Sequence, residues 1–331
     1  MNAKREPSGE DRLIERFFRP LASHPGALAL SDDAAYFTPP AGHDLVLTAD
    51  MIVAGVHFLA DDPADTIAKK ALRVNLSDLA AKGAEPVGAL LAISLPRAVE
   101  EGWIEAFSSG LGEDCVAFGC PLLGGDTTKT PGPLSISITA IGKVPAGEMV
   151  RRAGAKPGDL VVVSGTIGDG VLGLRVARSD SSLAPLSWDQ LDYLRHRYRV
   201  PEPRVALAPL LREYANAAMD VSDGLVGDLA KLARVSGVGA MLDTERLPLS
   251  NAAYDALDLA PGLLEDVLTG GDDYEVLCAI PEFRFASFAE AAGRLGVPVS
   301  PIGRFSEGEG VTVAGPGGQQ LSFKKGAYSH F

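Results

Sequence analysis

The chain has 331 residues, of which 46% are hydrophobic and 22% are charged, and its formal net charge at pH 7 is −13. This composition is typical of a globular protein, and the length favours two domains. The acidic balance, with no run of Lys or Arg, argues against binding to nucleic acid or to an anionic membrane surface. A protein of this charge that handles phosphate compounds must gather positive charge locally, most simply as Mg²⁺.

The expected compartment is the cytoplasm. The N-terminal segment is too charged for a signal peptide. The longest apolar run, in residues 86–96, is about half of the roughly 20 residues needed to span a bilayer. The three cysteines, Cys115, Cys120 and Cys278, form no CxxC pair, which favours a reduced chain.

The first half of the sequence mixes helix and strand patterns. Helical spacing is found at residues 10–18, 62–84 and 103–119. Strand patterns are found at residues 44–58, 88–96, 121–130 and 134–144. We expect an acidic break within the first of these strands and a Gly-Gly loop at the end of the third. The regular alternation of residues 134–144 predicts a strand of a half-covered, antiparallel sheet.

A Gly- and Pro-rich segment then marks a domain boundary near residue 148, which predicts domains 1–148 and 149–331. The second half shows strand patterns at residues 159–165 and 274–281, helical patterns at residues 170–179, 220–237 and 283–296, and a hairpin within 307–331. We expect a polar linker at residues 179–187 and a helix stop at Gly237. Because neither half keeps a strict βαβ rhythm, the sequence predicts two α+β domains.

Aspartates recur beside loops and element ends, at Asp32, Asp33, Asp50, Asp78, Asp126, Asp220, Asp223, Asp272 and Asp273. Each alone has an ordinary explanation in turn chemistry, and Ser222 or Asp223 could cap the helix that follows. If several meet in one cleft, their mutual repulsion requires cations or protonation. Mg²⁺ takes such oxygen ligands and bridges them to phosphates. The five histidines lack zinc-site spacing.

Phosphate handling has three candidate segments, since the sequence contains no P-loop and no protein-kinase signature. The glycines of "SGTIGDG" run GxxGxG, which fits an ordinary strand-helix turn better than a dinucleotide site. In "LLGGDTT", Gly124 and Gly125 allow backbone amides to approach an anion, and Asp126 could hold a metal. Arg151, Arg152 and Lys156 could clamp a phosphate or could lie in a solvated loop. A lone His57 after an apolar run is more often a half-buried residue than a ligand contact.

Seven ordered motifs resemble the thiamine-monophosphate kinase family, from about Glu10 to Phe331: "TADMIVAGVHF", "KKALRVNLSDLAAKGAEP", "LLGGDTT", "RRAGAKPGDLVVVSGTIGDG", "MDVSDGL", "LTGGDDYEVL" and "KGAYSHF". The family belongs to the superfamily of aminoimidazole-ribonucleotide synthetases and selenophosphate synthetases. The resemblance implies a two-domain α+β ATP-binding fold with mixed or antiparallel sheets flanked by helices. It also implies a homodimer built through the N-terminal domain, which would bind Mg-ATP.

The implied reaction is the phosphorylation of thiamine monophosphate to thiamine diphosphate by ATP, with Mg²⁺. Our own hypothesis is direct, Mg²⁺-assisted in-line transfer without a phosphoenzyme, because the acceptor is already an anion and no nucleophile is poised to form one. Carried over by motif, the magnesium ligands would be Asp33, Thr48, Asp50, Asp78, Asp126, Asp220 and Asp223. Asp50 and Asp126 would be catalytic. The contacts to ATP would be Gly125, Asp126, Arg152 and Ser222. The substrate contacts would be His57, Asp272 and Tyr328.

The sequence departs from the family pattern at two positions. Ala49 stands where Thr is common, so a hydroxyl group is missing beside Asp50. Asp272 stands where Glu is usual, so a carboxylate is kept with a shorter reach. Two alternative functions stay open: another ATP-dependent synthetase of the superfamily, and a non-catalytic nucleotide or metal sensor. The first is disfavoured because selenophosphate synthetases carry a reactive Cys or selenocysteine near the N-terminus, whereas no cysteine precedes Cys115 here, and because the hydrogenase-maturation relatives end in a Cys-bearing tail, whereas this chain ends in "AYSHF". The second is disfavoured because all six core aspartates are retained, and a sensor needs fewer metals.

Overall fold

The structure is a computed structural model that describes residues 12–323. Contacts divide the chain into two compact units, each of which is described by itself. Unit 1 comprises Met1–Asn75 and Pro86–Pro145, and unit 2 comprises Leu76–Glu85 and Ala146–Phe331. No helix among residues 12–323 is long and apolar enough to cross a membrane.

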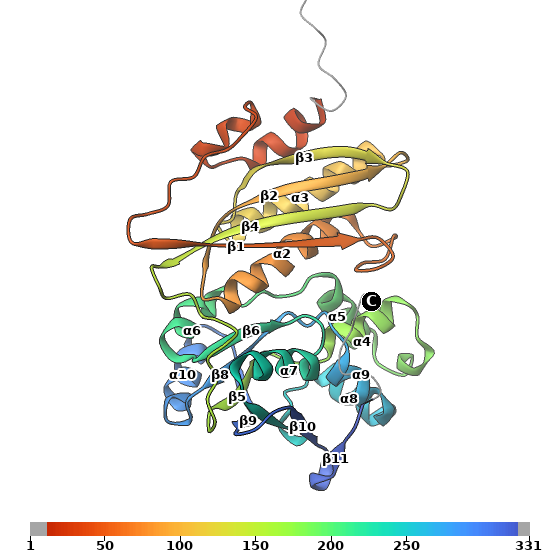
Figure 1. Ribbon diagram of the computed structural model, residues 1–331. Coiled ribbons are helices and arrows are strands. Elements are labelled where there is room, and N and C mark those ends of the chain that lie inside the picture. Colours follow the sequence, from red (N-terminus) through yellow and green to blue (C-terminus); the bar gives the residue numbers. More distant parts are fainter. Residues whose placement is uncertain (1–11, 324–331) are drawn as a thin grey trace, which may run out of the picture. The chain divides into compact units, whose positions relative to one another are not determined.

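Unit 1 is built on a four-stranded sheet with the strand order β1-β4-β2-β3 (Figure 1). Its strands are β1 (His43–Val53), β2 (Glu85–Pro96), β3 (Leu122–Thr130) and β4 (Ser135–Pro145). Strand β1 pairs antiparallel with β4, and β2 pairs parallel with β3, so the sheet is mixed. The alternating burial along β4 confirms the pattern expected for residues 134–144.

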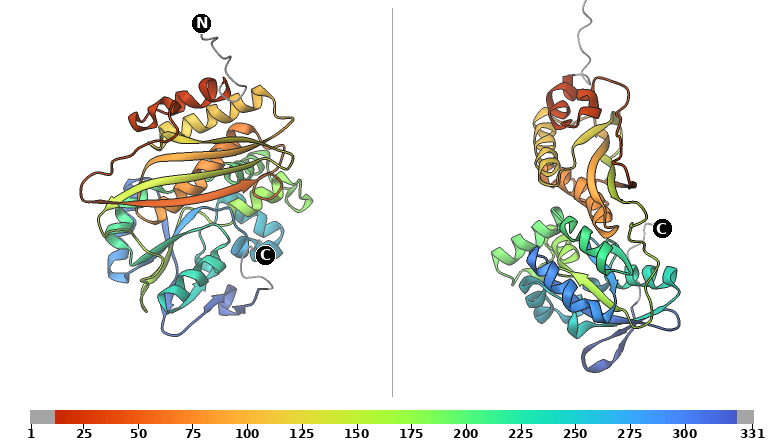
Figure 2. Two further views of the ribbon diagram at one scale, coloured as in Figure 1. Left: turned by 45° about the horizontal axis from the view of Figure 1, so that its top comes forward. Right: turned by 90° about the vertical axis from the view of Figure 1, so that its left-hand side faces the viewer.

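Helices α2 (Ala64–Ala81) and α3 (Glu101–Ala117) lie on one face of this sheet (Figure 2). They bury Ile67 and Leu72 from α2 and Phe107 from α3. The opposite face carries Leu47 and Met51 of β1, which are 64% and 58% exposed. Before β1 the chain forms the short helical segments η1 (Ile14–Phe18), η2 (Arg19–Leu21) and η3 (Pro25–Leu30). Unit 1 is therefore a two-layer arrangement with one open sheet face.

Two expectations for unit 1 are wrong. Strand β1 has no acidic break, since it pairs with β4 residue for residue from His43 to Val53, with Asp50 opposite Ile138. The Gly-Gly pair does not form a loop, because β3 continues through it beside β2. Gly125 lies so close to β2 that a Cβ atom there would be 1.8 Å from the Leu91 carbonyl oxygen. These glycines permit close strand pairing where a turn was expected.

Unit 2 is built on a seven-stranded sheet with the order β11-β10-β7-β9-β5-β8-β6. Its strands are β5 (Leu160–Ser164), β6 (Ala217–Val221), β7 (Gly239–Asp243), β8 (Glu275–Ile280), β9 (Val299–Ser306), β10 (Val311–Ala314) and β11 (Gln320–Leu321). Strands β7 and β10 are parallel, and the other pairs are antiparallel.

Helices flank both faces of this sheet. They are α4 (Asp169–Ala177), α5 (Trp188–Arg199), α6 (Ala208–Tyr214), α7 (Leu225–Ser236), α8 (Asn251–Leu259), α9 (Leu264–Thr269) and α10 (Glu282–Arg294). Short helical turns occur at η4 (Ser181–Leu183), η5 (Val205–Leu207), η6 (Thr244–Arg246), η7 (Pro261–Leu263) and η8 (Pro316–Gly318). Val161 and Val163 join one core with α4 and α7, whereas Val162 joins a second core with α6 and α10. The mixed sheets flanked by helices confirm the predicted α+β class.

The structure corrects the expected elements of unit 2 in three places. The segment predicted as one helix at residues 220–237 is the end of strand β6, a turn and helix α7, although the stop at Gly237 is confirmed by its left-handed φ of 67°. The expected linker is part of the fold, because Leu183 and Leu186 are buried in it. Helix α5 was missed, although its capping box of Ser187 and Gln190 is a recognisable start signal. The predicted hairpin is confirmed for β10 and β11, and residues 324–331 lie outside the described part.

We expect Gly125→Ala to destabilise the protein, because its methyl group would collide with the Leu91 carbonyl group of β2. The cost of such overpacking is about 1–3 kcal/mol. The control is Gly293→Ala in α10, where a Cβ atom meets nothing within 4 Å. Thermal unfolding should show a lower Tm for the first variant and an unchanged or higher Tm for the second. Equal Tm values would show that the strands separate freely at Gly125.

Candidate functional site

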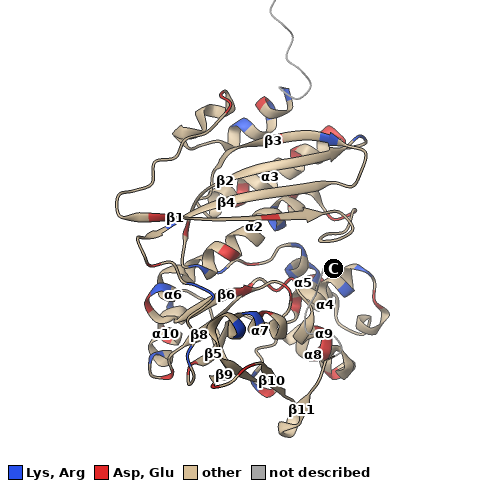
Figure 3. Cartoon of the chain, in the orientation of Figure 1, with Lys and Arg blue, Asp and Glu red and all other residues tan. Residues whose placement is uncertain are grey.

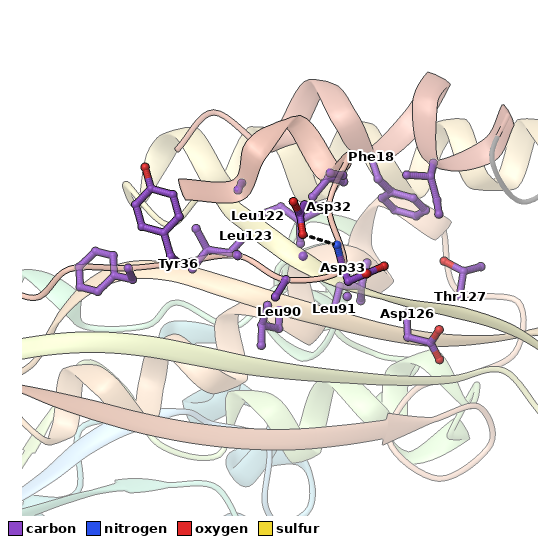
Figure 4. A pocket seen from close by; sticks show the side chains of 18 of the residues that line it. Phe18, Asp32, Asp33, Tyr36, Leu90, Leu91, Leu122, Leu123, Asp126 and Thr127 are labelled. Atoms are coloured by element: carbon purple, nitrogen blue, oxygen red, sulfur yellow. Dashed lines mark hydrogen bonds between the residues drawn. The ribbon is translucent and has the colours of Figure 1, made fainter. Parts of the chain in front are cut away.

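The main candidate site of unit 1 is a cavity of about 540 Å³ between the N-terminal segment and strands β2 and β3. Asp32 and Asp33 reach it from the N-terminal segment, and Asp126 and Thr127 reach it from β3 (Figure 4). The rest of its lining is largely apolar, with Phe18, Tyr36, Leu90, Leu91, Leu122 and Leu123 among the residues. An apolar cavity with a few convergent polar groups is typical of a small-molecule site.

The pairing of β2 with β3 determines where the polar end of this cavity lies. In the parallel ladder, Gly125 lies opposite Leu91 and Asp126 lies opposite Ala92. The close approach at Gly125 keeps β3 tight against β2, and Asp126 remains exposed. The structure thus brings the sequence-predicted Asp33, Gly125 and Asp126 to one cavity.

Strand β1 carries Thr48 and Asp50 on the same face, because successive side chains of a strand alternate. The Asp50 N–H group donates to the Asn75 side-chain oxygen of α2 at 3.0 Å. Ala49 points to the opposite face, together with Leu47 and Met51. The hydroxyl group missing at position 49 would therefore face away from the Asp50 side chain.

His57 lies in the turn after β1, and its Nδ1 atom accepts the Val53 N–H group at 3.0 Å. A neutral imidazole that accepts through Nδ1 carries its proton on Nε2. His57 is half-buried, as expected from the sequence for a lone histidine after an apolar run. Its tautomer makes Nε2 a hydrogen-bond donor.

In unit 2, the end of α2 meets strand β6. The Ser77 hydroxyl group donates to Asp220 Oδ2 at 2.9 Å, and Lys82 Nζ donates to the Ala218 carbonyl oxygen at 2.7 Å. The pKa of Lys82 is lowered to about 8, chiefly by burial and then by the nearby Arg152, while Asp220 and Asp78 oppose this shift. These interactions bring the predicted residues Asp78, Arg152 and Asp220 into one electrostatic neighbourhood around Lys82.

The turn between β6 and α7 is held by a buried carboxylate. Asp228 Oδ2 accepts the N–H groups of Ser222 and Asp223, each at 3.0 Å, and its Oδ1 atom pairs with Lys231 at 2.8 Å. Lys231 also pairs with Asp223. Burial raises the pKa of Asp228. Figure 3 shows acidic residues near the end of β6 and basic residues on α7.

This arrangement corrects the capping expectation. The N-cap residue of α7 is Gly224, and neither Ser222 nor Asp223 occupies that position. The carboxylate that satisfies the free amides of the turn belongs to Asp228, inside the helix. The side chains of Ser222 and Asp223 are half-buried.

Asp272 lies in a loop that packs against this turn. Its N–H group donates to the Ser222 carbonyl oxygen at 3.0 Å, and its φ of 73° is left-handed. The neighbouring Asp273 is 1% exposed and accepts the N–H groups of Gly168 and Gly170 at 2.8 Å and 3.0 Å. Burial raises the pKa of Asp273 to about 8, against the effect of these two bonds. The sequence included Asp273 among the recurring aspartates but gave it no separate role.

The predicted magnesium ligands are distributed over both units. Unit 1 contains Asp33, Thr48, Asp50 and Asp126, and unit 2 contains Asp78, Asp220 and Asp223. Within the described part of the chain, no group of three or more His, Cys, Asp or Glu side chains is arranged to hold a metal ion. The donors are all oxygen atoms, which is the ligand type that Mg²⁺ prefers. The predicted substrate residue Tyr328 lies outside the described residues.

Sequence reasoning missed two kinds of functional support. Lys82 lies in the motif "KKALRVNLSDLAAKGAEP", but its sequence context predicts no site role, since a single Lys at a helix end is usually solvated. Glu275 is buried and is paired with Arg204 at 2.6 Å and Arg197 at 3.0 Å. The signal for Glu275 was a charged residue directly before an apolar strand, in "YEVLCAIP".

We expect Lys82 to make stability depend on pH. The folded chain holds its pKa at about 8, against 10.5 for an unperturbed lysine, so the unfolded chain binds more protons between these values. Relative to Lys82→Met, the wild-type chain should therefore gain unfolding free energy as the pH rises from 8 to 10. Urea unfolding with EDTA present measures this, with the exposed Lys156→Met as the control. An identical pH dependence in all three proteins would contradict the assignment.

Comparison with known proteins identifies the family. Residues 31–144 match the AIR synthase related protein, N-terminal domain, and residues 156–315 match its C-terminal domain. The chain is 48% identical over 311 residues to a thiamine-monophosphate kinase from Caulobacter vibrioides, covering 93% of this chain and 87% of that protein.

Two solved structures agree with this result. The thiamine-monophosphate kinase of Stenotrophomonas maltophilia is 40% identical, with a TM-score of 0.80 and coverage of 94% of this chain and 96% of that one. AaThiL complexed with AMPPCP and TMP is 34% identical, with a TM-score of 0.78 and coverage of 91% of each chain. The chain belongs to the thiamine-monophosphate kinase family.

Proposed function

We propose that this protein transfers the γ-phosphoryl group of ATP to thiamine monophosphate and so forms thiamine diphosphate. The observation that carries this proposal is the near-full-length identity of 48% to a thiamine-monophosphate kinase. The AaThiL structure supports it, since AMPPCP is an ATP analogue and TMP is the acceptor. The cavity of unit 1 has a polar end at Asp33 and Asp126, whose carboxylates suit Mg²⁺, an ion that bridges carboxylates to phosphates.

The proposed magnesium ligands are those that the family motifs imply: Asp33, Thr48, Asp50, Asp78, Asp126, Asp220 and Asp223. Their oxygen atoms suit several Mg²⁺ ions, and zinc is disfavoured because no sulfur or imidazole joins the set. Bound Mg²⁺ would supply the positive charge that offsets two polyanionic substrates. In unit 2, Lys82 and Lys231 supply part of that charge from the protein itself.

The chain's own residues have separate tasks in this proposal. Gly125, Asp126, Arg152 and Ser222 bind ATP, while His57, Asp272 and Tyr328 bind thiamine monophosphate. His57 carries its proton on Nε2, so it can donate to a phosphate oxygen. The acceptor phosphate is already an anion, so the transfer needs no strong general base. Positioning and charge stabilisation therefore account for the catalysis.

The direct test is incubation of the protein with ATP, Mg²⁺ and thiamine monophosphate, followed by chromatography. Formation of thiamine diphosphate together with ADP supports the proposal. Consumption of ATP without thiamine diphosphate would favour another ATP-dependent synthetase of the superfamily. Binding of AMPPCP without any turnover of ATP would favour a nucleotide sensor.

We expect Asp50→Asn and Asp126→Asn each to reduce kcat by about a hundredfold or more, because each would remove a carboxylate ligand of the Mg²⁺ that offsets charge on the transferring group. Asp44→Asn is the matched control, since Asp44 is also exposed and lies on the same face of β1 as Asp50. Steady-state kinetics and circular dichroism on all three variants check the result. Near-normal turnover in both site variants would contradict the assigned roles.

A homodimer formed through unit 1 is part of the proposal. The open sheet face presents Leu45, Leu47 and Met51 of the edge strand β1, which are 37%, 64% and 58% exposed. A contiguous apolar face of this kind is typical of an interface between subunits. The cytoplasm remains the proposed compartment, and the three cysteines, which are all free and buried, are consistent with it.

We expect the double substitution Leu47→Asp and Met51→Asp to convert the dimer to a monomer, because it places two charges in the apolar contact. Val116→Asp is the control, since Val116 is 84% exposed at the end of α3. Light scattering after gel filtration measures the mass. An unchanged dimer in the double variant would show that the interface lies elsewhere. A monomeric wild-type chain would contradict the proposed homodimer.

A further inference from the structure

Three loops of unit 2 lie directly against one another: residues 165–170, 221–224 and 270–274. The N–H groups of Asp272 and Tyr274 donate to the carbonyl oxygens of Ser222 and Val221 at 3.0 Å and 2.8 Å. A Cβ atom at Gly271 would lie 2.2 Å from the Ser222 carbonyl oxygen. The loop that carries Asp272 is therefore packed backbone to backbone against the turn after β6.

Asp273 ties this loop to the start of helix α4. Its two carboxylate oxygens each accept one backbone bond, from Gly168 at 2.8 Å and from Gly170 at 3.0 Å. The contact is tight, because a Cβ atom at Gly170 would lie 2.3 Å from the Asp272 carbonyl oxygen. Because Asp273 is only 1% exposed, these two amides replace the water molecules that would bind its carboxyl group in solution.

The start of α4 is itself anchored. Asp169, which is fully buried, accepts bonds from Thr166 at 2.6 Å, Tyr193 at 2.8 Å and Ser250 at 2.6 Å. These partners lie on the loop before α4, on α5 and at the N-cap of α8. The bonds of Asp169 thus hold the start of α4 in place, together with the amides that Asp273 binds. Through these amides, Asp273 holds the loop of residues 270–274 against α4.

The residues on either side of Asp273 have an unfavourable backbone conformation that the surrounding structure must stabilise. Asp272 and Tyr274 have left-handed φ values of 73° and 53°. Residues with a Cβ atom are unfavourable in this region, and they persist where the surrounding structure holds them. Asp is among the residues that tolerate this conformation best, so Asp272 can occupy it when the surrounding structure holds the loop.

We propose that Asp273 is a positioning residue for thiamine monophosphate: by holding the loop against α4, it keeps Asp272 in the left-handed conformation from which its carboxylate meets the substrate. The inference rests on the proposed function, in which Asp272 contacts the substrate. The Asp272 side chain is short and has only two rotatable bonds, so the position of its carboxylate depends strongly on where the backbone lies.

The test is steady-state kinetics of Asp273→Asn in the full 331-residue chain. Asn keeps the shape but offers one acceptor oxygen in place of two, so one glycine amide loses its partner. We expect the KM for thiamine monophosphate to rise about tenfold or more, as leaving one buried amide without its hydrogen-bond partner implies, with the KM for ATP within about twofold. The control Asp258→Asn, an exposed carboxylate on α8, should change neither constant.

A double-mutant cycle separates positioning from general destabilisation. If Asp273 acts through Asp272, the variant with both Asp272→Asn and Asp273→Asn should have a KM for thiamine monophosphate no higher than Asp272→Asn alone. Val313→Ala, a core substitution in β10, should lower Tm without changing that KM. Multiplicative effects in the cycle, or equal increases in both KM values, would overturn the proposal.

A second variant covers the case in which Asp273→Asn fails to fold. Gly170→Ala keeps both aspartates but inserts a methyl group against the Asp272 carbonyl group, and it should raise the same KM. An unchanged KM for thiamine monophosphate in this variant would also overturn the inference. If the wild-type protein forms no thiamine diphosphate, the proposed function itself fails. If only Asp272→Asn affects the KM, the proposed function stands and the role of Asp273 falls.

Discussion

Buried carboxylates that accept backbone N–H groups determine the shape of the loops in unit 2. Asp228 binds the amides of Ser222 and Asp223, and Asp273 binds those of two glycines before and within α4. A carboxylate in an apolar interior is costly unless its oxygens are satisfied, so each of these bonds is difficult to break. The backbone of the loops is thereby fixed, while Ser222, Asp223 and Asp272 keep half-buried side chains. A site for phosphate transfer requires this combination of a rigid backbone and accessible ligands.

The same residue type has two roles in this protein, and burial distinguishes them. Asp228 and Asp273 are buried and hold amides, whereas Asp50 and Asp126 are exposed on their strands. The chain has a net charge of −13, to which these exposed carboxylates contribute, so phosphate substrates need cations close by. Lys82 illustrates the balance in unit 2, since burial and Arg152 lower its pKa while Asp78 and Asp220 raise it. In this account, the positive charges of the protein and of the proposed Mg²⁺ ions together offset the negative charge of the phosphate substrates.

The sequence predicted the features that depend on local periodicity. The long helix α2 and the alternating strand β4 have such patterns, and the family resemblance supplied the mixed two-domain fold. The acidic break in β1 was wrong because Asp50 belongs to a strand that continues through it, where an exposed charge costs little. The Gly-Gly loop was wrong because the close approach of Leu91 is a tertiary contact. The role of Asp273 was beyond prediction for the same reason, since its amide partners lie more than a hundred residues away in the sequence.

The central claim is that carboxylates of this chain bind the nucleotide through divalent cations. Calorimetric titration of the wild-type protein with AMPPCP, once with Mg²⁺ and once with EDTA, tests it most directly. The account predicts binding with Mg²⁺ and an affinity at least about a hundredfold weaker in EDTA, because uncompensated carboxylates repel the triphosphate. Equal affinity under both conditions would contradict it, since the protein's own cations would then suffice to hold the nucleotide.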